Sequence, residues 1–306
     1  MNITFLGTSS GVPSLTRNVS SLALKLSQSS EVWLFDCGEG TQSQMRKYKV
    51  GFSKINYIFI SHLHGDHFYG LIGLISTFGI LNREKKLTVF GPKGIQEIIL
   101  LHLKHSKSTI KFELIFHELT SHKSELIFED KKVEVYTIPL AHRVYTNGFL
   151  FKEKEKPRKL NMDVINLHKE IEICDYNNLK VGNDFKLSSG QIIKNSTLTK
   201  DPEKPLIYSY CSDTSYKEDL IEIIKDSDLL YHESTFLSDK EELALKTGHS
   251  TAKQAAKIAN KARVKKLILG HYSSRYKDTS LFLKEAAAIF NNVDLAETGK
   301  VFSIKN

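Results

Sequence analysis

Three histidines and one aspartate directly follow an apolar run, and this cluster constrains the chain more than any other feature. The run is Ile55–Ile60, and the cluster is His62, His64, Asp66 and His67. Because the run is β-branched and aromatic, it predicts a buried strand with the cluster on the loop at its carboxyl end. Three imidazoles and a carboxylate so close together cannot all be buried without hydrogen-bond partners or counter-charges.

The spacing H-x-H-x-D-H suits two metal ions. His62 and His64 would reach one ion, and Asp66 and His67 would reach a second after the turn at Gly65. A solvated histidine loop is the alternative for these residues.

The segment H-L-H-G-D-H resembles the signature of the metallo-β-lactamase superfamily. The remaining motifs are similar to the pattern of ribonuclease Z, the tRNA 3′-processing endonuclease, and they follow in that family's order over nearly the whole chain. These motifs are Phe5–Asn18, Phe35–Gln42, Gly91–Gly94, Pro139–His142, Ser212–Thr214, His232–Thr235, Gly248–Thr251 and Gly270–His271.

The resemblance implies an α/β fold, namely a four-layer αβ/βα metallo-β-lactamase sandwich of two mostly antiparallel sheets with helices outside. It also implies one domain over residues 1–306, with an inserted flexible arm at about 152–195 that binds tRNA. The composition agrees with a projecting segment, because a charge run at 152–159 precedes a stretch with little to bury. The segment lacks the Gly-Pro-rich stretch common in that arm, so a solvated lid or linker remains an alternative.

Apolar runs predict the elements around the cluster. We expect helices at 67–80, 93–104, 215–225 and 252–262. We expect strands at 2–7, 20–26, 31–36, 55–60, 87–90, 112–117, 124–128, 133–138, 206–211, 228–231 and 266–269. Polar groups follow the last three strands, as they follow strand 55–60, so both halves of the chain can converge on one site.

The resemblance implies two Zn²⁺ ions per subunit and seven ligands. The expected ligands are His62, His64, Asp66, His67, His142, Asp213 and His271. The residues alone leave other roles open. His142 could be a core histidine, and Asp213 could cap the helix expected at 215–225.

The same resemblance gives Asp66 and His249 catalytic roles. Asp66 would take the proton from the attacking water, and His249 would stabilise charge on the phosphate or donate to the leaving oxygen. The expected supporting residues are Asp36 and Glu233, which would orient metal ligands, and Arg17, Ser250, Thr251, Lys156 and Arg158, which would contact the substrate. Ser250 and Thr251 are equally good hydroxyl caps for the helix that follows.

The bulk composition is ordinary for a soluble enzyme of 306 residues, with 41% hydrophobic and 25% charged residues. The net charge of +8 favours an anionic partner. Three cysteines without C-x-x-C spacing indicate neither a disulfide framework nor a thiolate zinc site. Neither a long apolar run nor a secretory signal pattern is present, which predicts a cytoplasmic protein without a membrane segment.

The resemblance therefore implies a zinc endoribonuclease that removes the 3′ trailer from precursor tRNA, leaves a 3′-hydroxyl on the tRNA and acts as a homodimer. One rival is a hydrolase of the same fold for a small ester, lactone or cyclic nucleotide, which would not need the arm or the His249 loop. Another is a catalytically dead RNA-binding homologue, which would have no reason to keep seven ligand-type residues.

Overall fold

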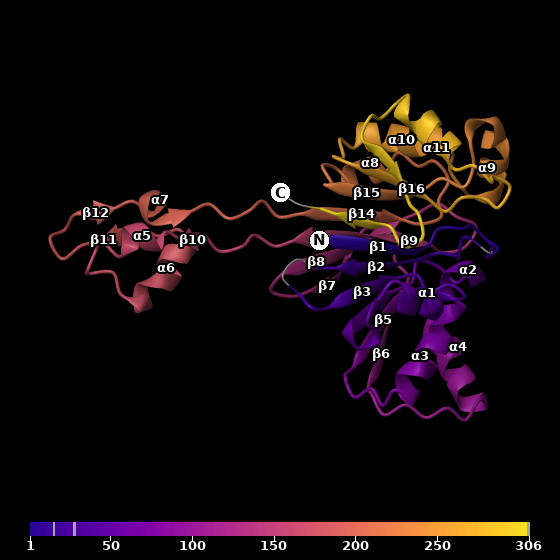
Figure 1. The fold of residues 1–306 in the computed structure, drawn as a ribbon, viewed down its shortest axis with the longest axis horizontal. Coiled ribbons are helices and arrows are strands. Elements are labelled where there is room, and N and C mark those ends of the chain that lie inside the picture. Colours follow the sequence, from indigo (N-terminus) through magenta and orange to yellow (C-terminus); the bar gives the residue numbers. More distant parts are fainter. Residues whose placement is uncertain (15, 27–28, 305–306) are drawn as a thin grey trace.

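The computed structural model describes residues 1–14, 16–26 and 29–304, and within them two seven-stranded sheets form the centre of the molecule (Figure 1). The first sheet, in the order β18-β1-β2-β3-β4-β5-β6, contains β1 (Asn2–Gly7), β2 (Ser21–Lys25), β3 (Val32–Phe35), β4 (Ile55–Phe59), β5 (Leu87–Pro92), β6 (Leu114–Leu119) and β18 (Val301–Ser303). The second sheet, in the order β17-β16-β15-β14-β9-β8-β7, contains β7 (Leu126–Glu129), β8 (Val133–Pro139), β9 (Asn147–Glu153), β14 (Ile207–Cys211), β15 (Leu229–Glu233), β16 (Leu267–Gly270) and β17 (Val293–Leu295).

Helices cover the outer face of each sheet, which gives the four expected layers (Figure 1). The first sheet carries α1 (Thr41–Lys47), α2 (Gly65–Phe68), α3 (Gly70–Ile80) and α4 (Ile95–His105), and a short 3₁₀ turn, η1 (Phe52–Lys54), precedes β4. The second carries α8 (Leu220–Ile223), η3 (Ser238–Lys240), α9 (Glu241–Thr247), α10 (Ala252–Lys261) and α11 (Ser280–Ala287). In the part of the chain that the structure describes, none of the helices is long and apolar enough to span a membrane.

The expectation of mostly antiparallel sheets is wrong. Across the described residues, each sheet has three antiparallel and three parallel neighbouring pairs. The parallel pairs arise wherever a helix connects two strands, because such a crossover returns the chain to the same edge of the sheet. The carboxyl ends of the parallel strands therefore lie together, and polar residues that follow them can meet.

Aromatic side chains fill the space between the sheets. Trp33 and Phe35 of β3 point to the second sheet and are fully buried, whereas Leu34 between them packs with the helices of the first layer. The Phe35 ring lies 5.0 Å from that of Phe151 and 6.0 Å from that of Phe149 on β9, measured between ring centroids. Since both faces of each sheet are covered, the strand ends are the positions from which side chains can form an accessible site.

Three of the four predicted helices are present. The helix expected at 67–80 is divided into α2 and α3, and those expected at 93–104 and 252–262 correspond to α4 and α10. The prediction of a helix over 215–225 is wrong, because the only helix in that range is the short α8. Hydrogen bonds instead tie the preceding segment to the chain after β8, since Ser215 N donates to Ala141 O and Ala141 N donates to Thr214 Oγ1.

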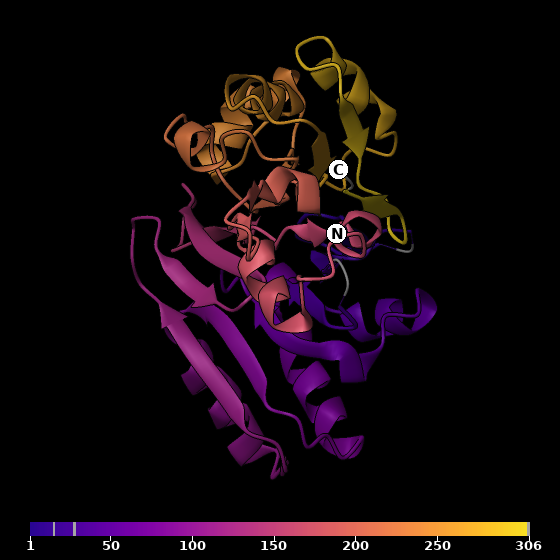
Figure 2. The same cartoon turned by 90° about the vertical axis from the view of Figure 1, so that its left-hand side faces the viewer.

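Residues 154–205 leave the two sheets and form a projecting segment, which lies to the left in Figure 1 and points toward the viewer in Figure 2. Its elements are β10 (Lys159–Leu160), α5 (Met162–Ile165), η2 (Ile173–Asp175), α6 (Tyr176–Lys180), β11 (Phe185–Lys186), β12 (Ile192–Ile193), α7 (Asn195–Leu198) and β13 (Thr199–Lys200). The two connecting chains pair where β10 meets β13.

The projecting segment differs from the expectation in two ways, namely in its buried residues and in its bounds. The segment has its own small core, made of Ile165, Ile171, Leu179, Ile193 and Leu198. Its bounds also differ from the expected 152–195. Residues 152 and 153 belong to β9, where Glu153 N donates to Leu206 O at 2.9 Å, and the chain returns to the body only at about residue 206.

Candidate metal centre

Polar residues at the ends of five strands gather at one edge of the sandwich. The loop after β4 carries His62 and His64 and leads into α2, which carries Asp66 and His67. His142 follows β8, Asp213 follows β14 and His271 follows β16, while Glu233 is the last residue of β15. The structure thus brings together all seven ligand-type residues that the sequence predicts, from both halves of the chain.

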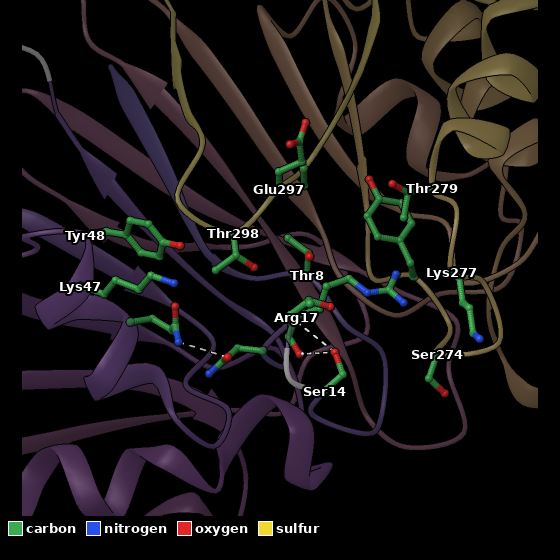
Figure 3. A pocket seen from close by; sticks show the side chains of 15 residues that line it. Thr8, Ser14, Arg17, Lys47, Tyr48, Ser274, Lys277, Thr279, Glu297 and Thr298 are labelled. Carbon is green, nitrogen blue, oxygen red and sulfur yellow. Dashed lines mark hydrogen bonds between the residues drawn. The ribbon is translucent and has the colours of Figure 1, made fainter.

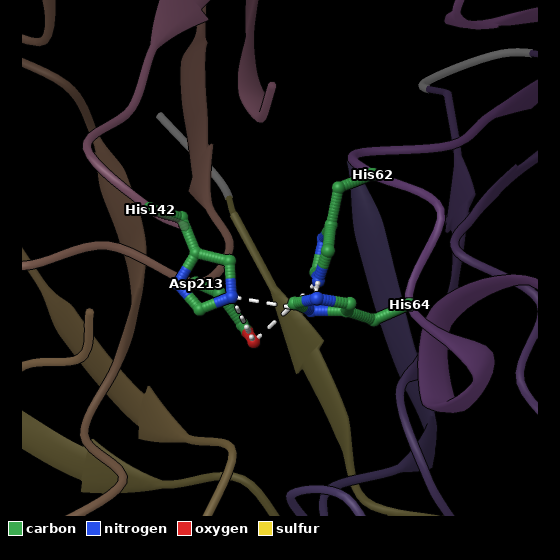
Figure 4. A group of neighbouring side chains, drawn as sticks. All are labelled: His62, His64, His142 and Asp213. Carbon is green, nitrogen blue, oxygen red and sulfur yellow. Dashed lines mark hydrogen bonds and ion pairs between the residues drawn. The ribbon is translucent and has the colours of Figure 1, made fainter. Parts of the chain in front are cut away.

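His62, His64, His142 and Asp213 form the first group of potential ligands (Figure 4). His64 Nδ1 lies 3.0 Å from His62 Nε2 and 3.2 Å from His142 Nε2. Asp213 Oδ2 lies 3.7 Å from His62 Nε2 and 3.9 Å from His142 Nε2. Three imidazole nitrogens and one carboxylate oxygen therefore face a common point.

Asp66, His67 and His271 form the second group. Asp66 Oδ2 lies 3.4 Å from Nε2 of His67 and 3.4 Å from Nε2 of His271, and these two nitrogens are 3.2 Å apart. Asp213 Oδ1 completes the group at 3.4 Å from His67 Nε2 and 3.2 Å from His271 Nε2. Asp213 therefore presents one carboxylate oxygen to each group and lies between them.

Hydrogen bonds to the opposite ring nitrogens fix the orientation of these imidazoles. His142 Nδ1 donates to Gly248 O at 2.7 Å, and His67 Nδ1 donates to Asp36 Oδ2 at 2.7 Å. His271 Nδ1 is 2.9 Å from the hydroxyl oxygen of Thr235. Such bonds to the remote nitrogen are typical of metal-binding histidines, because they keep the other nitrogen unprotonated and aimed at the metal.

Asp36 lies directly after β3 and is fully buried. Its Oδ1 accepts from Ser61 N at 2.8 Å, and its Oδ2 accepts from Tyr210 Oη at 2.6 Å as well as from His67. The backbone φ of Asp36 is 50°, in the left-handed region that non-glycine residues seldom adopt. His271, one of the potential ligands, has a similar φ of 61°, so both strand ends carry backbone strain at the site.

Glu233 is also fully buried and connects three parts of the site. Its Oε1 accepts from His249 Nδ1 at 2.9 Å, and its Oε2 accepts from Thr235 Oγ1 at 2.8 Å. Since the single hydroxyl hydrogen of Thr235 goes to Glu233, His271 Nδ1 must donate to Thr235. Glu233 therefore orients His249 directly and His271 through Thr235.

The donor set fits two divalent cations. Asp213 is a buried carboxylate, Asp66 is nearly so, and within the described ranges neither of the two pairs with a lysine or arginine. Buried negative charges without counter-ions are costly, and the histidine lone pairs that face one another would repel. The buried Asp213 Oδ1 also lacks a hydrogen-bond donor in the described structure. Zinc ions bound by these atoms would satisfy all three conditions.

The pKa values of the histidines and carboxylates in this cluster are shifted because the carboxylates favour positive charge next to them. Burial lowers the pKa of His67, but the carboxylates of Asp213 and Asp66 outweigh burial and raise it well above its usual value. For Asp213, burial raises the pKa, but His271 and His67 outweigh it and hold the pKa well below its usual value. Burial likewise lowers the pKa of His249, whereas Glu233 and Asp213 raise it to about 9. His249 is therefore a cation near neutral pH.

The expected substrate contacts fall in three different places. Arg17 lies on the loop before β2 and donates through Nη2 to Tyr276 O at 2.8 Å. In the stalk of the projecting segment, Lys156 lies 3.4 Å from a carboxylate oxygen of Glu203, and Arg158 pairs with Asp201.

Ser250 and Thr251 have structural roles, which corrects their assignment to substrate contacts. Both are fully buried. Ser250 Oγ donates to Thr214 O at 2.6 Å, and Thr251 caps α10 by accepting from Gln254 N. A substrate cannot reach either hydroxyl while these contacts hold, so the alternative of capping residues is the one that the structure supports.

Sequence reasoning missed several residues that support the site. Ser61 Oγ lies 3.0 Å from His62 Nδ1 and 3.0 Å from Asp36 Oδ2, and Tyr210 donates to Asp36. Gly11 N donates to Asp66 Oδ2 at 2.8 Å. Ser61 precedes the histidine cluster and Tyr210 precedes Asp213 by three positions, so proximity to a ligand in the sequence was the available signal.

Comparisons with known proteins agree with this geometry. Residues 1–155 match the family model described as anti-Pycsar protein Apyc1, and residues 129–272 match that of the beta-lactamase superfamily domain. The chain is 41% identical to ribonuclease Z of Bacteroides fragilis over 98% of this chain and 97% of that protein. It is 43% identical to ribonuclease Z of Prochlorococcus marinus over the full length of both.

Among solved structures, the short form of human tRNase Z superposes with a TM-score of 0.73 and 29% identity, over all of both chains. The ribonuclease Z sequences and the human tRNase Z structure align with nearly the whole of this chain, including both parts that supply the clustered residues. The chain therefore belongs to the ribonuclease Z family of endoribonucleases, which has the metallo-β-lactamase fold.

Proposed function

We propose that this protein is a zinc-dependent endoribonuclease that removes the 3′ trailer from precursor tRNA and leaves a 3′-hydroxyl on the tRNA. The observation that carries the proposal is the position of Asp213, which offers one oxygen to each of two histidine groups. Full-length identity of about 40% to proteins named ribonuclease Z supports the choice of substrate.

The residues expected to hold one zinc are His62, His64, His142 and Asp213, and those expected to hold the other are Asp66, His67, His271 and Asp213. When bound, two zinc ions would supply Lewis-acid chemistry, which lowers the pKa of water and withdraws electron density from the scissile phosphate. Asp66 is the proposed acceptor of the proton of the attacking water. Burial raises the pKa of Asp66, but His67 and His271 outweigh burial and lower it, which keeps this carboxylate ionised.

His249 is the proposed proton donor on the other side of the phosphate. Its Nδ1 is occupied by Glu233, so Nε2 is the nitrogen left for a substrate. A protonated imidazole there can stabilise negative charge on the phosphate or donate to the leaving 3′ oxygen. His249→Ala should therefore keep the zinc content and lose about 10²–10⁴-fold in rate. A rate equal to wild type would remove His249 from the mechanism.

The projecting segment is the proposed site for the body of the tRNA, because it is separated from the metal centre and extends from the sandwich (Figure 1). Charge alone does not explain such binding, since residues 154–205 contain ten Lys and Arg residues and eight Asp and Glu residues. Lys154, Lys156 and Arg158 pair with carboxylates in the stalk or the adjoining sheet. Neutralising these cations would leave carboxylates unpaired, so deletion is the cleaner test.

The decisive experiment compares a large and a small substrate. Wild-type protein should cut a precursor tRNA at the trailer and lose this activity with a chelator. A variant in which a short Gly-Ser linker replaces residues 156–204 keeps β9 and β14 intact, because Glu153 and Leu206 are hydrogen-bonded neighbours. This variant should raise KM for precursor tRNA by at least about tenfold, while hydrolysis of a small aryl phosphodiester stays unchanged.

Other outcomes favour other functions. If the wild type and the linker variant cleave precursor tRNA equally well, the segment is a lid or linker, and a phosphodiesterase for small substrates is favoured. Tight tRNA binding without hydrolysis of either substrate in the zinc-loaded protein would favour an RNA-binding protein.

We also propose that the enzyme works as a homodimer in which one subunit holds the tRNA that the other cuts. Exposed apolar residues at the end of α3, directly after it and on α4 support a partner-facing surface, and they are Ile80, Leu81, Ile98, Leu100 and Leu101. Mixing the linker variant with Asp66→Ala protein should restore cleavage, since each supplies what the other lacks. Failure of this mixture together with a monomeric mass would contradict the arrangement.

A further inference from the structure

A cavity of about 320 Å³ adjoins the first group of potential ligands, where His142 is part of its wall. It is distinct from a larger cavity, of about 530 Å³, that contains the expected substrate contact Arg17 (Figure 3). The smaller cavity is formed by the connection between β8 and β9, together with Ser121 and His122 from the segment before β7. Its volume is within the range of about 300–1,000 Å³ that small-molecule sites occupy.

Asn147 brings a buried acceptor without a partner to this cavity. The residue lines the cavity and is 1% exposed, and its Oδ1 has no hydrogen-bond donor among the residues that the structure describes. Asn147 is on the same face of β9 as Phe149 and Phe151, so it ends a row that is otherwise apolar. Buried polar groups in native proteins are nearly always satisfied, so the free oxygen indicates a ligand that donates a hydrogen bond.

Tyr145 fixes the orientation of this amide. The Tyr145 hydroxyl has one hydrogen, which it donates to Ser121 O at 2.9 Å. Its contact of 2.8 Å with Asn147 is therefore a bond that Asn147 Nδ2 donates. If the amide were turned by half a rotation, its oxygen would face the hydroxyl oxygen, and two acceptors would meet. The atom left for a ligand is therefore Oδ1, which can only accept.

The other walls of the cavity suit an aromatic ring and an anion. The rings of His122 and Tyr145 line it, with their centroids 5.4 Å apart and their planes at 81°. Arg143 also lines it, is exposed, and forms no ion pair within residues 1–14, 16–26 and 29–304. Proteins bind unpaired RNA bases against aromatic side chains, and guanidinium groups suit phosphate oxygens. The cavity therefore has the chemistry of a nucleotide site.

Two contacts place the cavity next to the metal centre. Asn147 N donates to Ser61 O at 3.1 Å, which ties the end of the cavity to the loop after β4. A Cβ added to Gly248 would lie 3.5 Å from Arg143 Cγ, so Arg143 is beside the loop that carries His249. A nucleotide in the cavity is therefore adjacent to a phosphodiester held at the metal centre.

We infer that this cavity binds one base of the RNA next to the cleaved linkage and selects a base with an exocyclic amine, which donates to Asn147 Oδ1. The ring of the base lies against His122 and Tyr145, and Arg143 binds the adjoining phosphate. The inference rests on the proposed ribonuclease activity. Uracil is the RNA base without an exocyclic amine, and it carries a carbonyl oxygen where cytosine carries the amine. The cavity therefore discriminates against uracil.

Mononucleotides test this selection without cleavage. Zinc-loaded wild type should bind cytidine 5′-monophosphate (CMP) about 10- to 100-fold more tightly than uridine 5′-monophosphate (UMP) in calorimetry, because uracil leaves Oδ1 unpaired. Asn147→Leu keeps the size of the side chain and removes the amide, so it should lower the affinity for CMP to that for UMP.

Tyr145→Phe tests the orientation of the amide while Asn147 stays in place. Without the hydroxyl, the amide can turn and donate to uracil through Nδ2, so UMP should bind more tightly and the preference for CMP should be lost. A residue with a purely structural role would not improve the binding of one mononucleotide. Tyr136→Phe is the matched control, since it removes a tyrosine hydroxyl of β8 that is not part of the cavity.

Precursor tRNAs that differ by one base locate the nucleotide. Uracil in place of cytosine should lower kcat/KM about 10- to 100-fold either directly before the cut or directly after it, and Asn147→Leu should abolish the difference. If wild type leaves precursor tRNA uncut but prefers CMP through Asn147, the proposed function fails and the base site stands. Equal binding of CMP and UMP by wild type, an unchanged preference in both variants, or equal cleavage of all the substrates would overturn the inference.

Discussion

Asp36→Asn is a sharp test of how the metal centre is held. The substitution keeps the size and shape of the side chain, and asparagine tolerates the φ of 50° at this position. It removes the charge and replaces one of two acceptor oxygens by an NH₂ donor. The carboxylate of Asp36 now uses both oxygens, because Oδ1 accepts from Ser61 N and Oδ2 accepts from His67 Nδ1.

Neither orientation of the asparagine amide can satisfy both partners. If the NH₂ group faces Ser61 N, two donors meet and a buried N–H loses its acceptor, which costs about 1–3 kcal/mol. If the NH₂ group faces His67, the imidazole must accept at Nδ1 and carry its proton on Nε2. Nε2 is the nitrogen that lies 3.4 Å from Asp66 and 3.2 Å from His271, so the ligand atom would be blocked.

We therefore expect Asp36→Asn to lower zinc affinity about 10- to 100-fold, as substitutions of residues that orient metal ligands commonly do. Competition with a chromogenic chelator measures this affinity. Tyr210→Phe is the control, because it removes one donor to Asp36 and leaves both oxygens for Ser61 and His67. Wild-type zinc affinity in Asp36→Asn, or an equal loss in Tyr210→Phe, would refute the orientation of His67 by Asp36.

Three further predictions follow from burial and backbone geometry. Asp66→Ala should abolish turnover and leave a folded chain with about one zinc, measured by elemental analysis, because the first group of ligands is untouched. Gly248→Ala should weaken zinc binding, since its Cβ would lie 2.8 Å from His142 Nδ1; Gly190→Ala, which has a similar positive φ and open space, isolates the backbone strain. A thiol reagent should label only Cys174 in the native protein and all three cysteines after unfolding, because Cys37 and Cys211 are fully buried and burial raises the pKa of Cys37 to about 12.

Much of the metal centre could be predicted because its residues have a local signature. The spacing of His62, His64, Asp66 and His67 after a strand is unusual enough to indicate metal binding by itself. His142, Asp213 and His271 each follow an apolar run, but a single histidine or aspartate there has several ordinary roles. The family pattern supplied the choice among these roles, and the structure places the three residues against the first cluster.

Other features depend on contacts between distant residues and left no local signal. Tyr210 and Asp36 are 174 positions apart, and the hydrogen bond between them forms only when the two sheets pack. The residues after Asp213 have a composition that suits a helix, but hydrogen bonds to Ala141 tie that segment to the chain after β8. The small core of the projecting segment was missed because its five buried residues are scattered over 34 positions without helical or strand periodicity.

The order of the strands explains why one site needs both sheets. In each sheet the three parallel pairs place strand ends along one edge, and packing the sheets face to face brings the two edges together. The first sheet supplies His62, His64, Asp66 and His67, and the second sheet supplies His142, Asp213 and His271. Because Asp213 contacts both groups, metal ions bound there would hold the two edges together. Metal binding should therefore stabilise the packing of the sheets as well as the chemistry, since ions that bind only the folded chain shift the folding equilibrium.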